Sequence, residues 1–413
     1  MDILRFITAG NVDDGKSTLI GRLLYDSKSI LIDQIEAIEK ASKFKDNGVL
    51  DLALITDGLR AEREQGITID VAYKYFSTPK RKFIIADAPG HIQYTRNMIT
   101  GASNSQLIIL LVDARTGITE QTKRHTFIAS LLKIPKIVVA VNKLDLVNFD
   151  ETIYKSIENE FKELSKKLNL TEVTFIPISA LNGDNIVDAS ENMSWYKGPT
   201  LLDFLETVNI QENENLEASR FPIQYIIRPQ TTELHDYRGY AGKITSGIFK
   251  KGDKIKIYPS EIEATISSIE VNLKEVDEAF APQSAVIQLD KDIDISRGDL
   301  IVNLNNQPKF TNELEVQVCW MHQKALQIGS KYLIQNQTNR VKEVVKSIEY
   351  LVDINTFEKQ FETSEVQLNQ IAKIKLKTAT PIAYDIFSEL QAQGGIIFID
   401  ETSNVTVGAG ILE

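Results

Sequence analysis

Hydrophobic and polar positions follow two different periods along the chain. From residue 1 to about 210, short apolar runs alternate with longer stretches of helical period, which is typical of a mostly parallel sheet with helices on both faces. The predicted strands are Leu4–Ala9, Tyr73–Ser77, Lys82–Asp87, Leu107–Val112, Ile137–Asn142 and Thr174–Pro177. The predicted helices are Lys16–Tyr25, Asp33–Lys43, Ile92–Ala102, Gln121–Leu132 and Glu151–Leu168.

After Arg220 the pattern changes to short alternating runs rich in Ile, Val and Tyr, separated by turn dipeptides such as Arg238-Gly239. This pattern indicates all-β structure closed into barrels. The acidic segment Gln211–Ser219 reads as a linker, and Asn, Gln and Pro cluster again at Asn305–Thr311. We therefore expect an α/β P-loop domain at 1–210 and two β-barrel domains at 220–305 and 311–413.

Composition narrows the class of protein. The 413 residues are 43% hydrophobic and 25% charged, with no apolar run long enough to span a membrane. An acidic second residue, Asp2, is unlike the basic start of a signal peptide. The single cysteine, Cys319, excludes an internal disulfide, and the net charge of -11 argues against a chain that coats nucleic acid. We expect a cytoplasmic protein with neither membrane nor nucleic-acid partners.

The strongest motif lies between the first predicted strand and the first predicted helix. Its spacing and its setting both match a Walker A loop. Gly10 and Gly15 allow the backbone N–H groups to face phosphates, Lys16 would reach the β- and γ-phosphates, and the Ser17 hydroxyl would bind Mg²⁺. An ordinary glycine turn is the alternative. The predicted phosphate-binding residues are Gly10, Asn11, Val12, Asp13, Asp14, Gly15, Lys16, Ser17 and Thr18.

A second motif, Asp87-Ala88-Pro89-Gly90-His91, follows a predicted strand at its carboxyl end. Open α/β sheets bind ligands at that edge, so Asp87 is predicted to reach Mg²⁺ through water. Gly90 would offer its N–H to the γ-phosphate, and His91 would position the attacking water. Asp87 could instead cap a helix, and His91 could be an ordinary surface or core histidine.

Two further segments predict which base is bound. Asn142-Lys143-Leu144-Asp145 follows another predicted strand, and a carboxylate at Asp145 can accept two N–H bonds from guanine that adenine does not offer. Asn142 can bind the N7 side of the ring. Unpaired polar groups in a buried site cost about 1–3 kcal/mol each, so this pairing would discriminate strongly. The predicted base pocket is completed by Ser179, Ala180 and Leu181.

Taken in order, these motifs resemble the translational-factor class of GTPases, of which elongation factor Tu is the archetype. The resemblance implies that Thr68 is a magnesium ligand and catalytic residue on a switch loop, alongside Lys16 and His91. It also implies an apolar gate formed by Val12 and Ile67, and Asp13 as a candidate ligand of a monovalent cation. By spacing alone, the segment before Thr68 could equally be a solvated helix face.

Flanking residues point to one branch of this class. The segments Asp13–Asp26, Asp57–Asp70 and His91–Met98 resemble the GTPase (large) subunit of bacterial sulfate adenylyltransferase. In the β-domains, Arg220–Tyr225 and Asn404–Gly410 do so too.

That resemblance implies GTP hydrolysis with Mg²⁺, coupled to the formation of adenylyl sulfate and pyrophosphate from ATP and sulfate. The partner would be a small catalytic subunit of the PP-loop ATP pyrophosphatase type, in a heterodimer or higher assembly. No second Walker A pattern follows residue 17, so we expect no fused adenylyl-sulfate kinase. An elongation factor Tu-like carrier of aminoacyl-tRNA and a regulatory GTP switch remain the alternatives.

Overall fold

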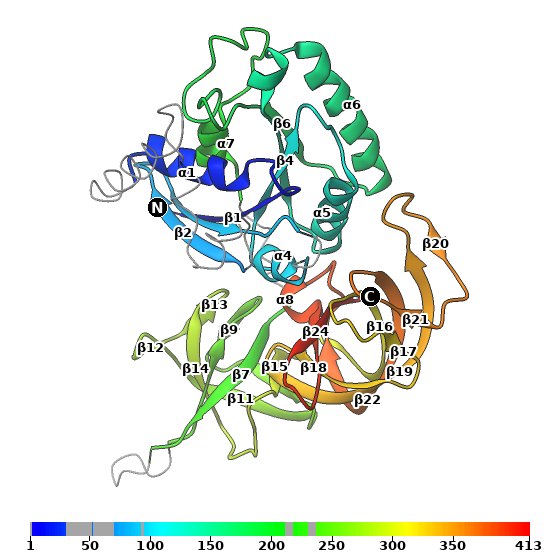
Figure 1. Cartoon of the computed structure of the whole chain (residues 1–413). Helices are drawn as coiled ribbons and strands as arrows, with labels where there is room; N and C mark the ends of the chain where they lie inside the picture. The colour runs from blue at the N-terminus through cyan, green and yellow to red at the C-terminus, as the bar shows by residue number, and fades with distance from the viewer. Residues whose placement is uncertain (1, 30–51, 53–69, 92–94, 211–217, 230–236) are drawn as a thin grey trace. The chain divides into compact units, whose positions relative to one another are not determined.

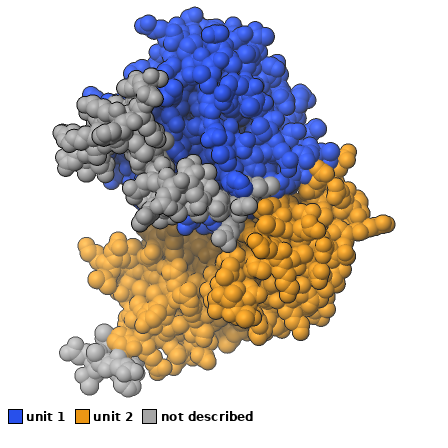
Figure 2. Space-filling model, in the orientation of Figure 1, with its two compact units in different colours: residues 1–210, 354–357 blue, residues 211–353, 358–413 orange. Residues whose placement is uncertain are grey.

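The structure is a computed structural model that describes residues 2–29, 52, 70–91, 95–210, 218–229 and 237–413. Two compact units make up the chain, residues 1–210 with 354–357 and residues 211–353 with 358–413 (Figure 2). Within the described ranges, no helix is both long and apolar enough to cross a membrane. The predicted domain limits at 1–210, 220–305 and 311–413 stay predictions.

The first unit is built on a six-stranded sheet with the order β2-β3-β1-β4-β5-β6. Figure 1 labels β1, β2, β4 and β6 among these strands. The strand pairs are parallel except for β2, which runs antiparallel to β3 at one edge. All seven residues of β4 are buried, which explains its unbroken apolar run. The strands are β1 (Ile3–Ala9), β2 (Ala72–Ser77), β3 (Lys82–Asp87), β4 (Leu107–Asp113), β5 (Lys136–Asn142) and β6 (Val173–Pro177).

Several helices of this unit begin after a residue whose side chain caps the N-terminus of the helix. Thr119 forms a capping box at the start of α5, and Asp150 and Thr200 cap α6 and α7. The predicted helix 33–43 lies outside the described residues, as do residues 92–94. The helices are α1 (Lys16–Asp26), α4 (Thr95–Ala102), α5 (Glu120–Leu131), α6 (Glu151–Lys167), α7 (Leu201–Thr207) and the 3-10 turn η3 (Leu144–Val147).

Strand register brings polar side chains together at the carboxyl edge of this sheet. Thr8 of β1 lies opposite Asp87 of β3, and Asp113 of β4 lies opposite Asn142 of β5. Below that edge the strands and α1 share one apolar core, whose α1 residues include Leu19 and Leu23. Burial of this core fixes the strands, so their polar ends are held in a defined arrangement.

The second unit holds two six-stranded antiparallel barrels. One has the order β10-β15-β7-β8-β14-β11 and closes through β10 and β11, and the other has the order β18-β23-β24-β16-β22-β19 and closes through β18 and β19. Together with the α/β unit they confirm the predicted fold class. The first barrel contains β7 (Arg220–Ile227), β8 (Gly239–Lys243), β9 (Ile248–Lys250), β10 (Lys254–Tyr258), β11 (Ile262–Val271), β12 (Lys274–Val276), β13 (Glu278–Phe280), β14 (Ser284–Leu289) and β15 (Leu300–Asn303).

Longer strands build the second barrel around Trp320 and Phe398, which are fully buried. Its elements are β16 (Lys309–Trp320), β17 (Leu326–Gln327), β18 (Lys331–Asn336), β19 (Asn339–Val352), β20 (Lys359–Gln360), β21 (Glu365–Val366), β22 (Ile371–Tyr384), α8 (Gln391–Gly394), β23 (Gly395–Ile399) and β24 (Thr406–Leu412).

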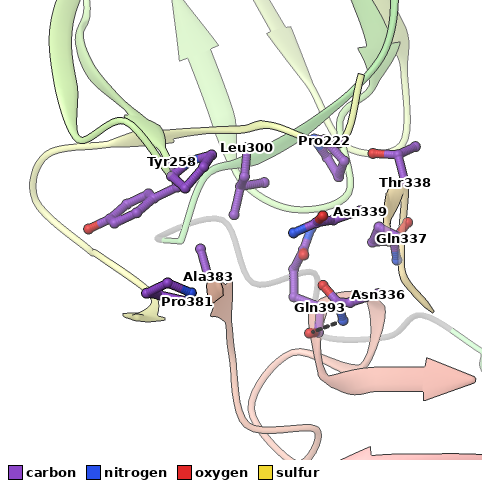
Figure 3. Close-up of a pocket in the computed structure, with 12 residues that line it drawn as sticks. Pro222, Tyr258, Leu300, Asn336, Gln337, Thr338, Asn339, Pro381, Ala383 and Gln393 are labelled. Atoms are coloured by element: carbon purple, nitrogen blue, oxygen red, sulfur yellow. Dashed lines mark hydrogen bonds between the residues drawn. The ribbon is translucent and has the colours of Figure 1, made fainter. Parts of the chain in front are cut away.

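A small cavity lies between the two barrels, lined by residues of both, among them Pro222, Asn336 and Thr338 (Figure 3). Asn336 Nδ2 donates to the main-chain oxygen of Gln393 at 2.9 Å. At about 20 Å³ the cavity has room for one water molecule. It is therefore a packing gap rather than a substrate pocket.

Candidate nucleotide-binding site

The predicted phosphate loop joins β1 to α1, as its spacing requires. Asn11 N–H donates to Asp14 Oδ2 at 2.6 Å, and Val12 N–H donates to Asn11 Oδ1 at 2.9 Å. Asp13 adopts φ 65°. These local bonds hold the loop in a tight turn, with Ser17 and Thr18 in the first turn of α1. The turn and the helix N-terminus together can supply N–H groups to phosphates.

Lys16 folds back over this loop. Its ammonium donates to the main-chain oxygens of Asn11 at 2.7 Å and Gly10 at 3.2 Å. Burial lowers the pKa of Lys16, and the negative charges of Asp87, Asp14 and Asp13 oppose that shift. A buried ammonium held by two carbonyls, with carboxylates nearby, is well placed to exchange the carbonyls for phosphate oxygens.

Gly15 lies where the phosphate loop meets Asn142, one of the predicted base-reading residues, and this position requires a glycine. It adopts φ +93°, and a β-carbon there would lie 2.5 Å from Asn142 Nδ2. Asn142 donates from that nitrogen to Asp14 O at 2.7 Å and accepts from Ala180 N–H at 2.9 Å. Asn142 therefore ties the phosphate loop to the segment that begins at Ser179.

The residues predicted to hold Mg²⁺ lie on adjacent elements. Asp87 is 2% exposed at the end of β3 and accepts from Thr8 Oγ1 at 3.3 Å. Ser17 is half-buried at the start of α1. One carboxylate and one hydroxyl fit Mg²⁺, which usually takes its other ligands from phosphates and water. Thr68, the third predicted ligand, lies outside the described residues.

Gly90 packs directly on the phosphate loop, after Ala88 and Pro89. A β-carbon on Gly90 would lie 2.5 Å from Lys16 Nζ and 2.9 Å from Val12 N. His91, the next residue, is half-buried. The structure thus brings the Asp87–His91 segment against the loop of the first motif.

The predicted base-reading groups meet at the carboxyl ends of β5 and β6. Ser179 Oγ donates to Asp145 Oδ1 at 2.6 Å. Ser179 and Ala180 are buried, whereas the Leu181 side chain is 48% exposed. Ser179 N–H also pairs with Asp184 O at 3.2 Å, which closes the loop that follows β6. The structure therefore brings Asp145, Asn142 and the loop after β6 together, as the sequence predicts for the base-reading residues.

Comparison with known proteins agrees with this geometry. The family model for the Elongation factor Tu GTP binding domain matches residues 1–211, and the model described as GTP-eEF1A C-terminal domain-like matches residues 313–413. "Sulfate adenylyltransferase subunit 1" of Teredinibacter turnerae is 49% identical over 99% of this chain and 87% of its own length. The chain belongs to the sulfate adenylyltransferase subunit 1 family.

The chain is also similar to the "Bifunctional enzyme CysN/CysC" of Mycobacterium tuberculosis, with 49% identity over 99% of this chain and 67% of that protein. Among solved structures, the GTPase-like domain of S. cerevisiae Ski7 bound to GTP covers all of this chain and 97% of that domain, at 18% identity and a TM-score of 0.54. That likeness shows the shared fold. The family and its GTP-binding domain identify the chain as a GTPase.

Two residues, Asp113 and Arg22, contact the predicted site residues but belong to none of the motifs identified in the sequence. Lys143 donates to Asp13 O and pairs with Asp113 Oδ2 at 3.0 Å. Burial would raise the pKa of Asp113, but hydrogen bonds from Arg115 and Lys143 outweigh it and lower the pKa to about 2. Asp113 ends β4 at the same edge as Asp87 and Asn142, a signal that could have found it. Arg22 of α1 donates to the loop that follows β6 and likewise belongs to no motif.

Proposed function

We infer that this GTPase is the subunit that couples GTP hydrolysis to sulfate activation, the formation of adenylyl sulfate and pyrophosphate from ATP and sulfate. The observation that carries the proposal is that the sequence holds one nucleotide-binding set of motifs, with a base end suited to guanine. The adenylyl transfer itself needs ATP. It is therefore assigned to a separate partner subunit, in keeping with the name "subunit 1" printed for the relatives.

On this proposal, the phosphate loop and Lys16 bind the β- and γ-phosphates of GTP. Ser17 and Asp87 would hold Mg²⁺, which supplies positive charge beside the transferring phosphoryl group when it is bound. His91 would orient water for in-line attack on the γ-phosphorus. The bond to the β-γ bridging oxygen then breaks, GDP leaves, and the water's proton ends on the released phosphate. We assign Thr68 to the same step, as a switch-loop ligand.

We further propose that the partner is a small subunit of the PP-loop ATP pyrophosphatase type, bound in a heterodimer or larger assembly. The chemistry supports this division, since forming adenylyl sulfate breaks the α-β bond of ATP and releases pyrophosphate. GTP hydrolysis breaks a β-γ bond of a different nucleotide. The two reactions share no reactant, so the free energy of GTP hydrolysis must reach the other site through contacts within the complex.

The proposal is tested with the co-expressed pair. We expect Lys16→Ala to abolish GTP binding and the GTP-dependent rise in adenylyl sulfate, because the buried ammonium is lost from the phosphate site. Lys155→Ala is the matched control, since Lys155 is an exposed lysine of α6 with a side chain 61% accessible. Adenylyl sulfate and pyrophosphate are measured with and without GTP. Equal rate and extent in Lys16→Ala and wild type would overturn the coupling.

A further inference from the structure

Arg22 of α1 contacts the base-reading loop instead of the phosphate loop that its own helix follows. Its Nε donates to Ala180 O at 3.3 Å, and its Nη2 donates to Leu181 O. The side chain is 17% exposed and pairs with Asp26 at 3.4 Å, one helical turn further along α1. One guanidinium therefore holds two successive carbonyls of a loop nearly 160 residues away in sequence.

A continuous series of hydrogen bonds runs from Arg22 to the predicted guanine-reading carboxylate. The Leu181 oxygen belongs to the same planar peptide group as the Asn182 N–H, so fixing one fixes the direction of the other. Asn182 N–H donates to Ser179 Oγ at 3.3 Å. Ser179 Oγ in turn donates to Asp145 Oδ1 at 2.6 Å.

Gly183 of the same loop lies in van der Waals contact range of Arg22 and Asp26. Gly183 adopts φ +92°, and a β-carbon there would lie 3.5 Å from Asp26 Oδ2 and 3.7 Å from Arg22 Cδ. Gly183 N–H donates to Ser179 O at 2.8 Å, which keeps the turn closed. The Arg22–Asp26 pair therefore packs against a closed turn, in which the direction of one peptide bears on its neighbours.

We propose that Arg22 is a positioning residue that sets guanine specificity, because it orients Asp145 through the Leu181–Asn182 peptide and Ser179. This inference rests on the proposed role of Asp145 in reading guanine. On this proposal Arg22 acts through these hydrogen bonds rather than by contact with the base. A lysine is a poorer replacement, since its ammonium is a compact point charge on a flexible stem and lacks the rigid, planar donor fork of the guanidinium.

The test compares Arg22→Lys with wild type for binding of GDP, IDP and ADP to the full chain. IDP lacks the exocyclic amine of guanine, so the GDP-to-IDP affinity ratio reports how well Asp145 is oriented. We expect Arg22→Lys to weaken GDP binding roughly tenfold, as for loss of a charge-assisted hydrogen bond, and to lower the GDP-to-IDP ratio. ADP affinity, the melting temperature and kcat at saturating GTP should stay unchanged while KM rises.

Arg297→Lys is the matched control, because Arg297 also donates to a main-chain oxygen, that of Gln224 at 2.8 Å, but in a barrel. An unchanged GDP-to-IDP ratio in folded Arg22→Lys would overturn the inference. If Arg22→Lys does not fold, the same binding measurement is made with Asp26→Asn, which weakens the ion pair of Arg22 without removing the arginine. An unchanged GDP-to-IDP ratio in Asp26→Asn would also overturn the inference. Wild type that does not prefer GDP to ADP would instead refute the proposed guanine site.

Discussion

Buried charged groups are handled differently in the two units of this chain. In the α/β unit, Asp113 is compensated by Lys143 and Arg115, and the group lies at the carboxyl edge of the sheet. In the barrel unit, Arg220 is fully buried and bonded to Asp385, whereas Glu343 is 4% exposed and its pKa shift includes no oppositely charged neighbour among the described residues.

The difference shows that burial of a charge does not by itself mark a functional site. At the sheet edge, bound phosphates and a metal ion can supply further partners for the charged side chains. The Arg220 guanidinium already has its hydrogen-bond partners within the protein, since it also donates to the main-chain oxygens of Ser219 and Asn306. Glu343 avoids the cost of an unpaired buried charge by holding its proton, because burial raises its pKa to about 8.

Breaking the Arg220 pair should have the largest effect. Arg220→Met leaves Asp385 without the two bonds of 2.8 Å that it accepts from Arg220. We expect a loss of about 3–5 kcal/mol in the free energy of unfolding of the barrel unit, the usual cost of stranding one member of a buried ion pair. Denaturant unfolding is followed by Trp320 fluorescence in a Trp195→Phe background, which leaves Trp320 as the reporter.

The control is the double variant Arg220→Met with Asp385→Leu. Removing both charges should recover much of the loss, because no unpaired buried charge remains. A double variant as unstable as the single one would show that Arg220 acts through packing alone.

Glu343 should make the barrel unit less stable as the pH rises. The folded protein keeps this proton up to about pH 8, whereas an unfolded glutamate releases it near pH 4.5. Unfolding therefore releases a proton in that window, so stability is highest below it. Between pH 6 and pH 7 we expect a loss of about 1.4 kcal/mol. Glu343→Gln should remove this dependence, measured by the same Trp320 fluorescence. Parallel pH profiles for the variant and wild type would contradict the assignment.

At the sheet edge, Asp113→Asn should weaken GDP binding about tenfold, since Lys143 loses its charged partner. Fluorescent GDP titration of the full chain measures the change. Arg115→Gln is the milder comparison, because the Asp113–Lys143 pair of 3.0 Å remains. If Asp113→Asn binds GDP as wild type does, Lys143 is held by Asp13 O alone.

Ion pairs on the surface should contribute least to the free energy of unfolding. Lys155 and Glu151 form an i,i+4 pair on α6, with side chains 61% and 41% exposed. We expect Lys155→Ala to cost about 0.3–0.5 kcal/mol at most. Unfolding of the α/β unit is followed through Trp195 in a Trp320→Phe background. A loss above 2 kcal/mol would mean that the comparison between paired buried and paired exposed charges is mistaken.

The sequence predicts candidate site residues most sharply where a motif follows an apolar strand. Asp87 and Asn142 are predicted this way, and the structure places both at the carboxyl edge of the sheet, where the ends of parallel strands gather. Asp113 ends β4 in the same manner but carries no familiar motif. Arg22 could not be found, since its partners at 180 and 181 become neighbours only through folding. Helix α7 was missed because its two turns are too short for a clear period.

The central claim is that GTP turnover is coupled to sulfate activation, and one measurement tests it most directly. GTP hydrolysis is followed with the purified chain alone and with its partner subunit, each with and without ATP and sulfate. We predict that ATP and sulfate together raise the hydrolysis rate only when the partner is present. A rate that does not respond to ATP and sulfate in the assembled complex would contradict the account.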